Sequence, residues 1–215
     1  MDVERLLTTT RSVRRSLDLD TPVDRADIRE CLRIGLQAAN GSNQQSWRWL
    51  LVFEPALREK IAALYRDAYL LRVGGQMIAD LIPAETSQGR LLSSIEWLVE
   101  NMAKVPLLVI PCYEPSTPRI DGDESFHRAT LYGSIFPAVW NFQLALHARG
   151  YGTCLTTLHL HHERTVGELL GIPETYLQAC LLPVGRLPTG RAFRPARRRP
   201  VEEVVAVDGW NGPAV

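Results

Sequence analysis

The sequence lacks an apolar run long enough to cross a membrane, and it lacks an apolar stretch of the secretory type near its start. A membrane-spanning helix needs about 20 consecutive apolar residues, and charged or polar residues interrupt every apolar run before that length. The first residues, MDVERLLTTTRS, place acidic and basic side chains where a secretory signal would be apolar. We therefore expect a cytoplasmic protein with no membrane partner.

Cysteine is scarce, and its spacing disfavours the usual cysteine-based sites. Zinc and redox sites are built from close cysteine pairs, and the chain has four cysteines but no C-x-x-C pair. Each lies in an apolar run: Cys31, Cys112, Cys154 and Cys180. We predict buried free thiols in a reducing compartment.

An excess of charge of either sign is missing as well. Lys+Arg and Asp+Glu both number 24, whereas a nucleic-acid-binding domain usually carries a basic excess. The arginines are nevertheless clustered, in RSVRR at 11–15 and in RRRP at 197–200. Local basic clusters in a neutral protein favour a small anionic ligand, so we expect no nucleic-acid partner.

The signatures of hydrolytic, nucleotide and metal chemistry are absent. The chain has no G-x-S-x-G elbow and no P-loop, which are the usual motifs of serine hydrolases and NTP-binding enzymes. HLHHE at 159–163 holds three histidines, but no further histidine and carboxylate follow at the spacing of a metal site. We predict no metal site there, and we interpret the stretch as a loop that leads into a helix.

Helical and strand patterns alternate along the chain. Helical periodicity predicts helices at 24–39, from Pro55 through Ala68, and at 90–104, 131–149 and 165–170. Short apolar runs predict strands at 47–53, 106–112, 152–158 and 178–185. This alternation favours a layered arrangement of helices around a central sheet. The 131–149 helix is apolar on nearly every side, so we expect it to be buried in the domain centre or in a subunit interface.

Three stretches show neither helical nor strand periodicity. Residues 73–89 and 113–126 are interpreted as loop or lid segments, and residues 186–215 as an extended C-terminal arm. One strand-like run, EEVVAVDGW, lies within that arm and could pair with its own sheet or with a partner subunit. Because no internal repeat occurs, we predict one domain over residues 1–215.

Two arginine clusters and one polar loop are the candidate binding residues. Arginine binds phosphate through paired hydrogen bonds, so the clusters at 11–15 and 197–199 could converge on one phosphate group. The loop NGSNQQSW at 40–47 offers Asn43 and Gln45, whose amides can both donate and accept at the edge of a flat heterocycle. The same residues also suit solvated chain ends and a turn that faces water.

Several stretches together resemble the nitroreductase family of FMN-dependent oxidoreductases. They are TTTRSVRRSLDLDTPV at 8–23, AANGSNQQSWRWLLVF at 38–53, NFQLALHARGYGTCLTTL at 141–158, and IPETYLQACLLPVGRLP with RRRPVEEVV within 172–205. The resemblance implies an α+β fold with a central mixed sheet flanked by helices. It also implies a homodimer with FMN at the subunit interface and a C-terminal arm exchanged onto the partner's sheet.

The resemblance further implies roles for individual residues. Arg11 and Arg199 match ligands of the FMN phosphate, with Arg197 as a second C-terminal candidate. Arg15 would face the ribityl chain and the pyrimidine edge, where a positive charge stabilises the anionic reduced flavin. The other implied contacts are Ser12 and Val13 near the phosphate, Asn40, Gly41 and Asn43 from the other subunit, Ser134 on the long helix, and Leu155, Thr156, Thr157 and Leu158 along the flavin. The chain departs from the usual family pattern at 39–40, 45–47 and 157–158, which leaves the choice of substrate open.

The function that this resemblance implies is hydride transfer from NADH or NADPH, through flavin N5, to a nitroaromatic, a quinone or a similar flat acceptor. The chemistry belongs to the flavin, so no catalytic side chain is required. Tyr69 and Trp97 are weaker candidates for the substrate pocket, since Tyr69 borders a segment that could act as a lid. The alternative is a flavin-binding or flavin-remodelling protein of the same fold without NAD(P)H turnover.

Overall fold

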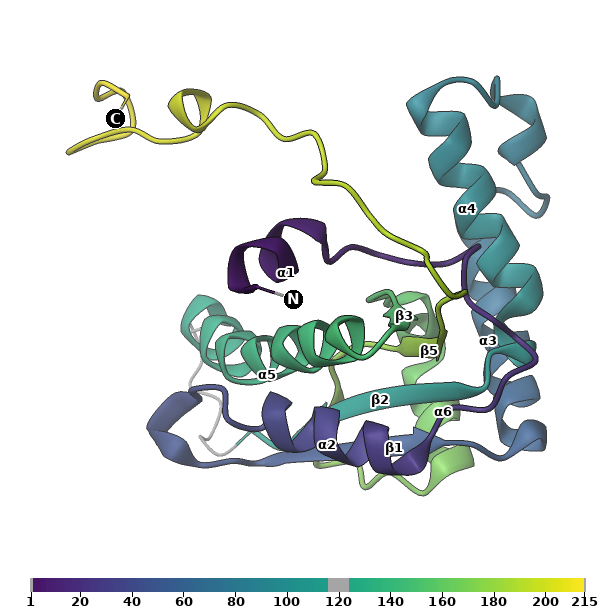
Figure 1. The fold of residues 1–215 in the computed structure, drawn as a ribbon. Helices are drawn as coiled ribbons and strands as arrows, with labels where there is room; N and C mark the ends of the chain where they lie inside the picture. The colour runs from purple at the N-terminus through teal and green to yellow at the C-terminus, as the bar shows by residue number, and fades with distance from the viewer. Residues whose placement is uncertain (1, 116–123, 215) are drawn as a thin grey trace.

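The computed structural model describes residues 2–115 and 124–214, and it places a small sheet between two groups of helices (Figure 1). The helices are α1 Val3–Thr9, α2 Arg25–Gly35, α3 Pro55–Arg72, α4 Ser87–Asn101, α5 Glu124–Ala148 and α6 Glu163–Leu170. The strands are β1 Trp47–Val52, β2 Leu107–Tyr113, β3 Tyr151–Thr153, β4 Leu177–Gln178 and β5 Leu182–Arg186. Short 3₁₀ helices are η1 Gly41–Asn43, η2 Ala79–Leu81, η3 Met102–Lys104, η4 Leu158–His162 and η5 Val201–Glu203.

The sheet has the strand order β1-β2-β5-β3, with β4 also paired to β2. The α+β class is therefore confirmed. The mixed sheet is not found in the described part of one chain, because every strand pair there is antiparallel. The C-terminal arm would have to supply a parallel strand, and beyond β5 it forms only η5 and irregular backbone.

The strand β2 lies at the centre of the core, as its continuous apolar run predicts. All of its residues are buried, and their side chains alternate between the two faces of the sheet. Leu108 and Ile110 pack with α3 and α4, whereas Leu107 and Val109 pack with α2 and α5. Two hydrophobic clusters therefore form, one on each face of the sheet. The four cysteines are also buried, as predicted.

The long helix α5 begins earlier than predicted, at Glu124, and ends at Ala148 ahead of Gly150, whose φ is +77°. Its inner face is buried against α2 and β3. Within one chain the helix is not buried on every side, because Tyr132 and Trp140 are 46% and 42% exposed, and its burial in a subunit interface stays a prediction. Apolar residues all around a helix therefore do not find enough partners in a single copy of this chain.

The segments without a clear period have more structure than expected. Residues 73–86 turn through Gly74 and Gly75, both with positive φ, and then form η2. The helix α4 begins at Ser87, inside the stretch predicted as a loop, because the Thr86 side chain caps it by accepting from the Gly89 N–H. Of the predicted loop 113–126, Tyr113 belongs to β2, Glu124 opens α5, and residues 116–123 lie outside the described residues.

Two other boundaries differ from the predictions. The predicted strand 152–158 ends at Thr153; Thr156 then forms a single bridge to Leu181, and Leu158 opens η4. The run EEVVAVDGW is not a strand, and its side chains are exposed. Figure 1 shows this arm leaving the body of the molecule after β5. Within the described residues, no helix is long and apolar enough to cross a bilayer.

Candidate functional site

The segment 11–15 lies against the end of β3. The backbone N–H of Val13 donates to the Thr153 carbonyl at 2.8 Å, and the Val13 side chain is buried. This approach requires Gly152, because a Cβ there would lie 2.9 Å from side-chain atoms of Val13 and Leu17. The structure therefore brings together two stretches that the sequence singled out, namely RSVRR and the segment that begins at Leu155.

The three arginines of this segment point to different partners. The Arg11 guanidinium lies 5.8 Å from the centre of the Phe193 ring. The Arg14 guanidinium lies near the Cys154 thiol, and Arg15 donates to the Ser93 hydroxyl on α4. Within residues 2–115 and 124–214, none of these arginines forms an ion pair with a carboxylate. Their charge is therefore available to an anionic ligand.

Arg14 was not among the residues predicted to contact the cofactor, and the structure makes it a better candidate than Arg15. Burial raises the pKa of the Cys154 thiol to about 11, while the nearby Arg14 guanidinium acts in the opposite direction. Arg14 thus lies at the start of the 155–158 stretch, whereas exposed Arg15 turns toward α4. The Leu17 N–H donates to the Arg14 carbonyl at 3.1 Å and closes a turn, so Arg14 and Arg15 leave the backbone in different directions. The sequence alone does not show which of them faces the site.

The stretch 155–158 is held by contacts on two sides. The Thr156 N–H donates to the Leu181 carbonyl at 3.0 Å, and the Leu181 N–H donates back at 2.8 Å. The Thr156 hydroxyl lies 2.8 Å from the Tyr65 hydroxyl. Burial raises the pKa of Tyr65 to about 12, so this phenol keeps its proton at neutral pH. The backbone N–H of Thr156 is thus already occupied, which leaves its hydroxyl as the polar group able to face a ligand.

The polar loop at 40–45 has an unusual backbone. Ser42, Asn43 and Gln45 have φ values of 51°, 52° and 51°, a region that side chains other than glycine and asparagine rarely adopt. The Gly41 N–H donates to the buried Ser134 hydroxyl at 3.0 Å, and Asn40 Oδ1 accepts from the Gln45 N–H at 3.0 Å. Strained backbone of this kind is concentrated at functional sites. Ser134 therefore holds the loop in place rather than lying open to a ligand.

The predicted site has two halves, the 40–45 loop and the arginine segment 11–15, and they lie far apart in one chain. The 40–45 loop is fixed to Ser134 in the first half of α5, whereas Thr9, just before RSVRR, lies 3.5 Å from the His147 ring at the other end. From Ser134 to His147 the helix rises about 20 Å, at about 1.5 Å per residue. A single chain therefore does not bring Asn40, Gly41 and Asn43 to the same small ligand as Arg11.

The C-terminal arginines do not meet Arg11 either. Arg199 is exposed and pairs with Glu203 at 3.2 Å, while the Arg197 carbonyl accepts from Arg198 at 3.2 Å. Arg191 shares an aromatic neighbour with Arg11, because its guanidinium is 5.4 Å from the centre of the same Phe193 ring. Arg191 stands alone in the sequence, so clustering was not a signal that could have identified it.

The two weaker pocket candidates belong to the core or pack against it. Tyr69 is 4% exposed, and its hydroxyl donates to Glu96 Oε1 at 2.7 Å. Trp97 is half-buried and packs against the same hydrophobic cluster. The structure therefore does not support Tyr69 as a wall of an open pocket, since its ring and its hydroxyl are both engaged inside the protein.

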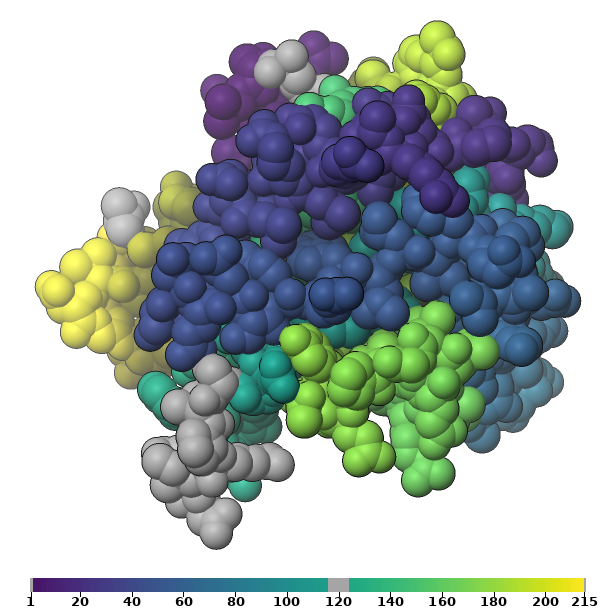
Figure 2. All heavy atoms as spheres, turned by 90° about the horizontal axis from the view of Figure 1, so that it is seen from below, coloured from purple at the N-terminus to yellow at the C-terminus, as the bar shows by residue number. Residues whose placement is uncertain are grey.

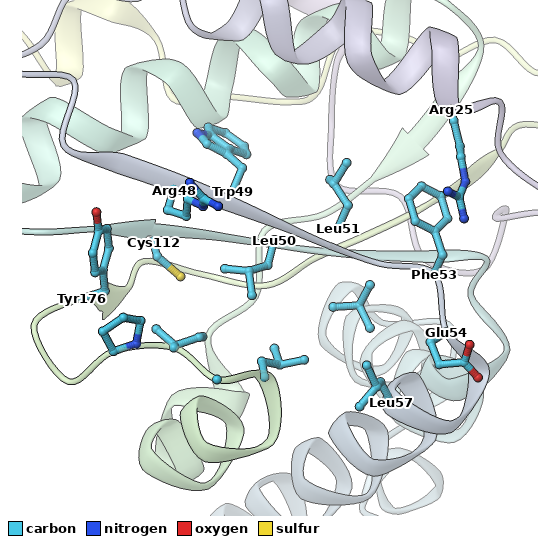
Figure 3. Close-up of a pocket in the computed structure, with 15 residues that line it drawn as sticks. Arg25, Arg48, Trp49, Leu50, Leu51, Phe53, Glu54, Leu57, Cys112 and Tyr176 are labelled. Atoms are coloured by element: carbon cyan, nitrogen blue, oxygen red, sulfur yellow. The ribbon is translucent and has the colours of Figure 1, made fainter.

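A cavity of about 930 Å³ lies elsewhere, along the outer edge of β1. Figure 2 shows this hollow between the blue segment with β1 and the green segment after α6, and Figure 3 shows Arg48, Leu50 and Tyr176 around it. In the described part of the chain, β1 pairs only with β2, so its other edge has unpaired backbone groups. Such an edge is a template for one more strand.

The fold, with its antiparallel sheet and its arginine segment beside β3, is that of a nitroreductase-like flavoprotein. The chain belongs to the nitroreductase family, whose sequence model matches residues 7–186. Human iodotyrosine deiodinase 1 is 25% identical over 205 residues, which cover 93% of this chain and 66% of the relative. The iodotyrosine deiodinase of Daphnia pulex is 24% identical over 94% of this chain and 64% of its own length. The chain thus spans about two thirds of the length of these curated relatives.

Solved structures show the same fold. An iodotyrosine deiodinase bound to FMN and 3-iodo-L-tyrosine superposes with a TM-score of 0.69 at 20% identity, covering 93% of this chain and 97% of that one. A BluB-like flavoprotein from Clostridium difficile 630 gives a TM-score of 0.70 at 20% identity, covering 96% and 98%. The family is therefore one of flavoproteins, and FMN is bound in at least one neighbour of this fold.

The residues of this chain fit FMN by their chemistry. Guanidinium groups without carboxylate partners suit a phosphate, and the segment 11–15 presents three of them. Half-exposed Leu155 and the hydroxyl of Thr156 lie next to that segment and suit the flat ring and its polar edge.

Proposed function

We propose that this protein is an FMN-dependent oxidoreductase, which passes hydride from NADH or NADPH to a nitroaromatic, a quinone or a similar flat acceptor. The observation that carries the proposal is the segment 11–15, which lies against β3 beside Leu155 and Thr156 and whose arginines have no carboxylate partner among the described residues. When bound, FMN supplies the atom that takes up and releases hydride, N5. The protein binds the cofactor, orients it and adjusts its electrostatic surroundings.

In this proposal each residue has a separate task. Arg11 binds the phosphate, and Ser12 and Val13 line the adjoining chain. Arg14 faces the pyrimidine edge, where its positive charge favours the negatively charged reduced form. Arg15 stays a candidate for the same contact, although its partner in the structure is Ser93.

Tyr65 and Thr156 orient a proton toward the site. Because Tyr65 keeps its proton, it can donate to Thr156 Oγ1 and leave the Thr156 hydroxyl proton free to donate in another direction. Leu155, Thr157 and Leu158 then form the surface along the ring. No side-chain acid is needed, since water can deliver protons in an open cleft.

We also propose that the working unit is a homodimer. About 20 Å along α5 separates the anchor of the 40–45 loop from that of the arginine segment. A second copy of the chain is therefore needed to bring Asn40, Gly41 and Asn43 to the same ligand as Arg11. Tyr132 and Trp140 on α5 supply exposed aromatic surface for such an interface. Aromatic residues that become buried when two proteins associate are typical anchors of the contact.

The exposed arm is the second part of the dimer proposal. Val201 and Val204 are exposed, and Trp210 is 95% exposed. Apolar surface in water is unfavourable in free energy, and a partner that covers these side chains would remove that cost. The free edge of β1 and the cavity beside it offer a place for this arm in the other subunit. Arg197 and Arg199 would then be carried toward the partner, where they can reach a phosphate that they do not reach in one chain.

The test is an absorption spectrum of the purified protein, repeated without oxygen in the presence of NADH and of NADPH. We expect flavin bands that bleach with at least one nucleotide and return when a quinone is added. A yellow protein that neither nucleotide bleaches would support flavin binding or remodelling instead. A colourless protein that does not take up added FMN would contradict both.

A second candidate is reductive removal of a halogen from an aromatic ring, which the similarity to two iodotyrosine deiodinases favours. In that reaction the carbon–iodine bond is replaced by carbon–hydrogen and iodide leaves; the reduced cofactor would supply two electrons, and water would supply the proton. The test is iodide release from 3-iodo-L-tyrosine by the chemically reduced protein. Turnover with quinones but no iodide release would remove this candidate.

A further inference from the structure

One fully buried histidine lies directly after the 155–158 stretch. His159 is 0% exposed, and among the residues that the structure describes neither of its ring nitrogens has a hydrogen-bond partner. Such a group is uncommon in a protein interior, because a buried donor or acceptor without a partner costs free energy. The proposed hydride transfer does not use this ring, so its place in the fold calls for another explanation.

His159 belongs to η4, which continues the 155–158 stretch without a break. Leu158 is the first residue of η4, and the Thr157 carbonyl accepts from the Leu160 N–H at 3.0 Å. Thr157 and Leu158 are therefore held by the same turn that buries His159. A movement of the His159 ring into solvent would displace both of these residues.

Two contacts with α3 keep this turn closed. At one end, the Tyr65 hydroxyl lies 2.8 Å from the Thr156 hydroxyl. At the other end, His162 Nε2 lies 2.8 Å from Asp67 Oδ2. A proton on His162 makes the second contact an ion pair and so favours the closed turn. Acid can therefore open the turn only through a different group.

Within the described part of the chain, no neighbouring charge stabilises a proton on His159, and burial alone lowers the pKa of its ring to about 4. His161 is exposed. The titratable groups beside η4 on the helices that pack against it are engaged with other partners, namely Tyr65 and Asp67 on α3 and Glu163 on α6. An isolated charge in an apolar interior is unfavourable. A protonated His159 ring is therefore stable only when it reaches water.

We propose that η4 is an acid-operated latch, in which protonation of His159 opens the turn, displaces Thr157 and Leu158 and releases the flavin. The proposal rests on the proposed function, which places the 155–158 stretch along the cofactor.

The direction of the pH effect follows from the two states of the ring. In the open turn the ring is in water, where its pKa is about 6.5, whereas burial in the closed turn lowers its pKa to about 4. The open form therefore binds the proton more tightly, and its fraction rises as the pH falls from about 6.5 toward about 4. Above about pH 6.5 the latch stays closed.

The test compares the full-length wild-type protein with three variants at pH 7.5 and at pH 5.0. His159→Leu and His159→Gln each remove the titrating ring, one with an apolar and one with a polar side chain of similar size. His161→Leu is the matched control, because His161 is exposed on the same turn. Hydrogen exchange of the 158–162 amides, corrected for the intrinsic pH dependence of exchange, measures opening of the turn without any flavin. The rate of FMN release from the loaded protein measures the consequence.

In the wild-type protein and in His161→Leu, the opening equilibrium and the rate of FMN release should both rise by about tenfold or more from pH 7.5 to pH 5.0. In the His159 variants both rises should stay below about twofold. Far-UV circular dichroism at pH 5.0 checks that the helices stay folded, which separates local opening from global unfolding.

Equal rises in the wild-type protein and in a folded His159 variant overturn the proposal. A rise in opening with an unchanged rate of FMN release also overturns it, because the turn would then not hold the cofactor. Failure of the proposed function is distinguishable from both outcomes. In that case the wild-type protein would bind no flavin at pH 7.5, while hydrogen exchange would still decide whether His159 opens the turn.

Discussion

At the scale of single residues, neighbouring arginines in one short segment have different surroundings. Arg14 meets the buried Cys154 thiol, while Arg15 reaches out to Ser93. This difference arises because Val13 is fixed to β3 by a backbone hydrogen bond, which sets the direction of each side chain that follows. The roles of these residues in cofactor binding should therefore differ as well.

We predict that Arg14→Ala raises the Kd of FMN by about tenfold or more, because it removes a charge-assisted contact. Arg15→Ala should raise it by less than about threefold, since Arg15 is engaged with α4. Fluorescence titration of flavin-free protein measures both values. A larger effect of Arg15→Ala than of Arg14→Ala would support the role that the sequence resemblance implies for Arg15, which is contact with the ribityl chain and the pyrimidine edge.

Another residue-scale prediction concerns pH. His159 is fully buried, neither ring nitrogen has a hydrogen-bond partner in the described residues, and burial lowers the pKa of this ring to about 4. The neutral ring suits the folded state, so its contribution to stability is complete above about pH 6.5 and is lost as the pH falls from there to about 4. The loss should reach about 3 kcal/mol, at about 1.4 kcal/mol per unit of pKa.

Urea unfolding at pH 7.5 and at pH 4.5 measures this effect. His159→Leu removes the titrating ring, so the fall in unfolding free energy between the two pH values should become smaller than in the wild-type protein. The exposed His161 offers the matched control, since His161→Leu should leave that difference unchanged. Equal pH dependence in wild-type and His159→Leu protein would show that the buried ring does not titrate as predicted.

At the scale of elements, one side chain joins α4 to α3 and to the segment between them. Glu96 is 8% exposed, and its Oε1 accepts from the Tyr69 hydroxyl at 2.7 Å and from the Ile78 and Ala79 N–H groups at 2.6 and 3.0 Å. Three donors would remain buried without a partner if this carboxyl group were lost. The same helix also receives Arg15 at Ser93, so α4 links the 73–86 segment to the arginine segment.

We predict that Glu96→Ala lowers the free energy of unfolding by about 2 to 4 kcal/mol and speeds hydrogen exchange of the Ile78 and Ala79 amides. Glu100→Ala is the control, because Glu100 is exposed on the same helix one turn further on. Its effect should stay within about 0.5 kcal/mol. Equal exchange rates in the two variants would mean that other contacts hold the segment.

At the scale of the whole molecule, the two halves of the predicted site do not meet in one chain. The loop at 40–45 is fixed to Ser134 in the first half of α5, and Thr9, just before the arginine segment, lies beside His147 near the end of that helix. Apolar side chains on α5 and along the C-terminal arm remain exposed in the single chain. Two copies related by a two-fold axis would pair each loop with the arginine segment of the other subunit.

This arrangement predicts complementation between two inactive variants. Arg11→Ala/Arg14→Ala and Asn40→Ala/Asn43→Ala should each bind little FMN alone. When their subunits are mixed and allowed to reassociate, about a quarter of the wild-type sites should return, because half of the randomly formed two-fold dimers carry one intact site. Flavin content after removal of unbound FMN measures the outcome. No recovery in a mixture shown to exchange subunits would place both halves of the site in one chain.

What the sequence by itself determined are the features that depend on neighbouring residues. The buried strand around 107–113, the helical periodicity of α2 to α6 and the turn at 40–45 follow from local apolar spacing and from turn residues. The approach of 11–15 to 155–158 was implied only by family resemblance, since it joins residues that are far apart in the chain.

Only the tertiary structure decided the contacts made across long stretches of chain. It brought Arg11 and Arg191 to the same Phe193 ring, Glu96 to Ile78 and Tyr65 to Thr156, and it separated the 40–45 loop from the arginine segment by about 20 Å along α5. The physical reason is that periodicity encodes which face of an element is buried. Which side chains then meet depends on how the elements pack, and Ser134 and His147 on α5 lie too far apart for one chain to unite the two halves of the predicted site.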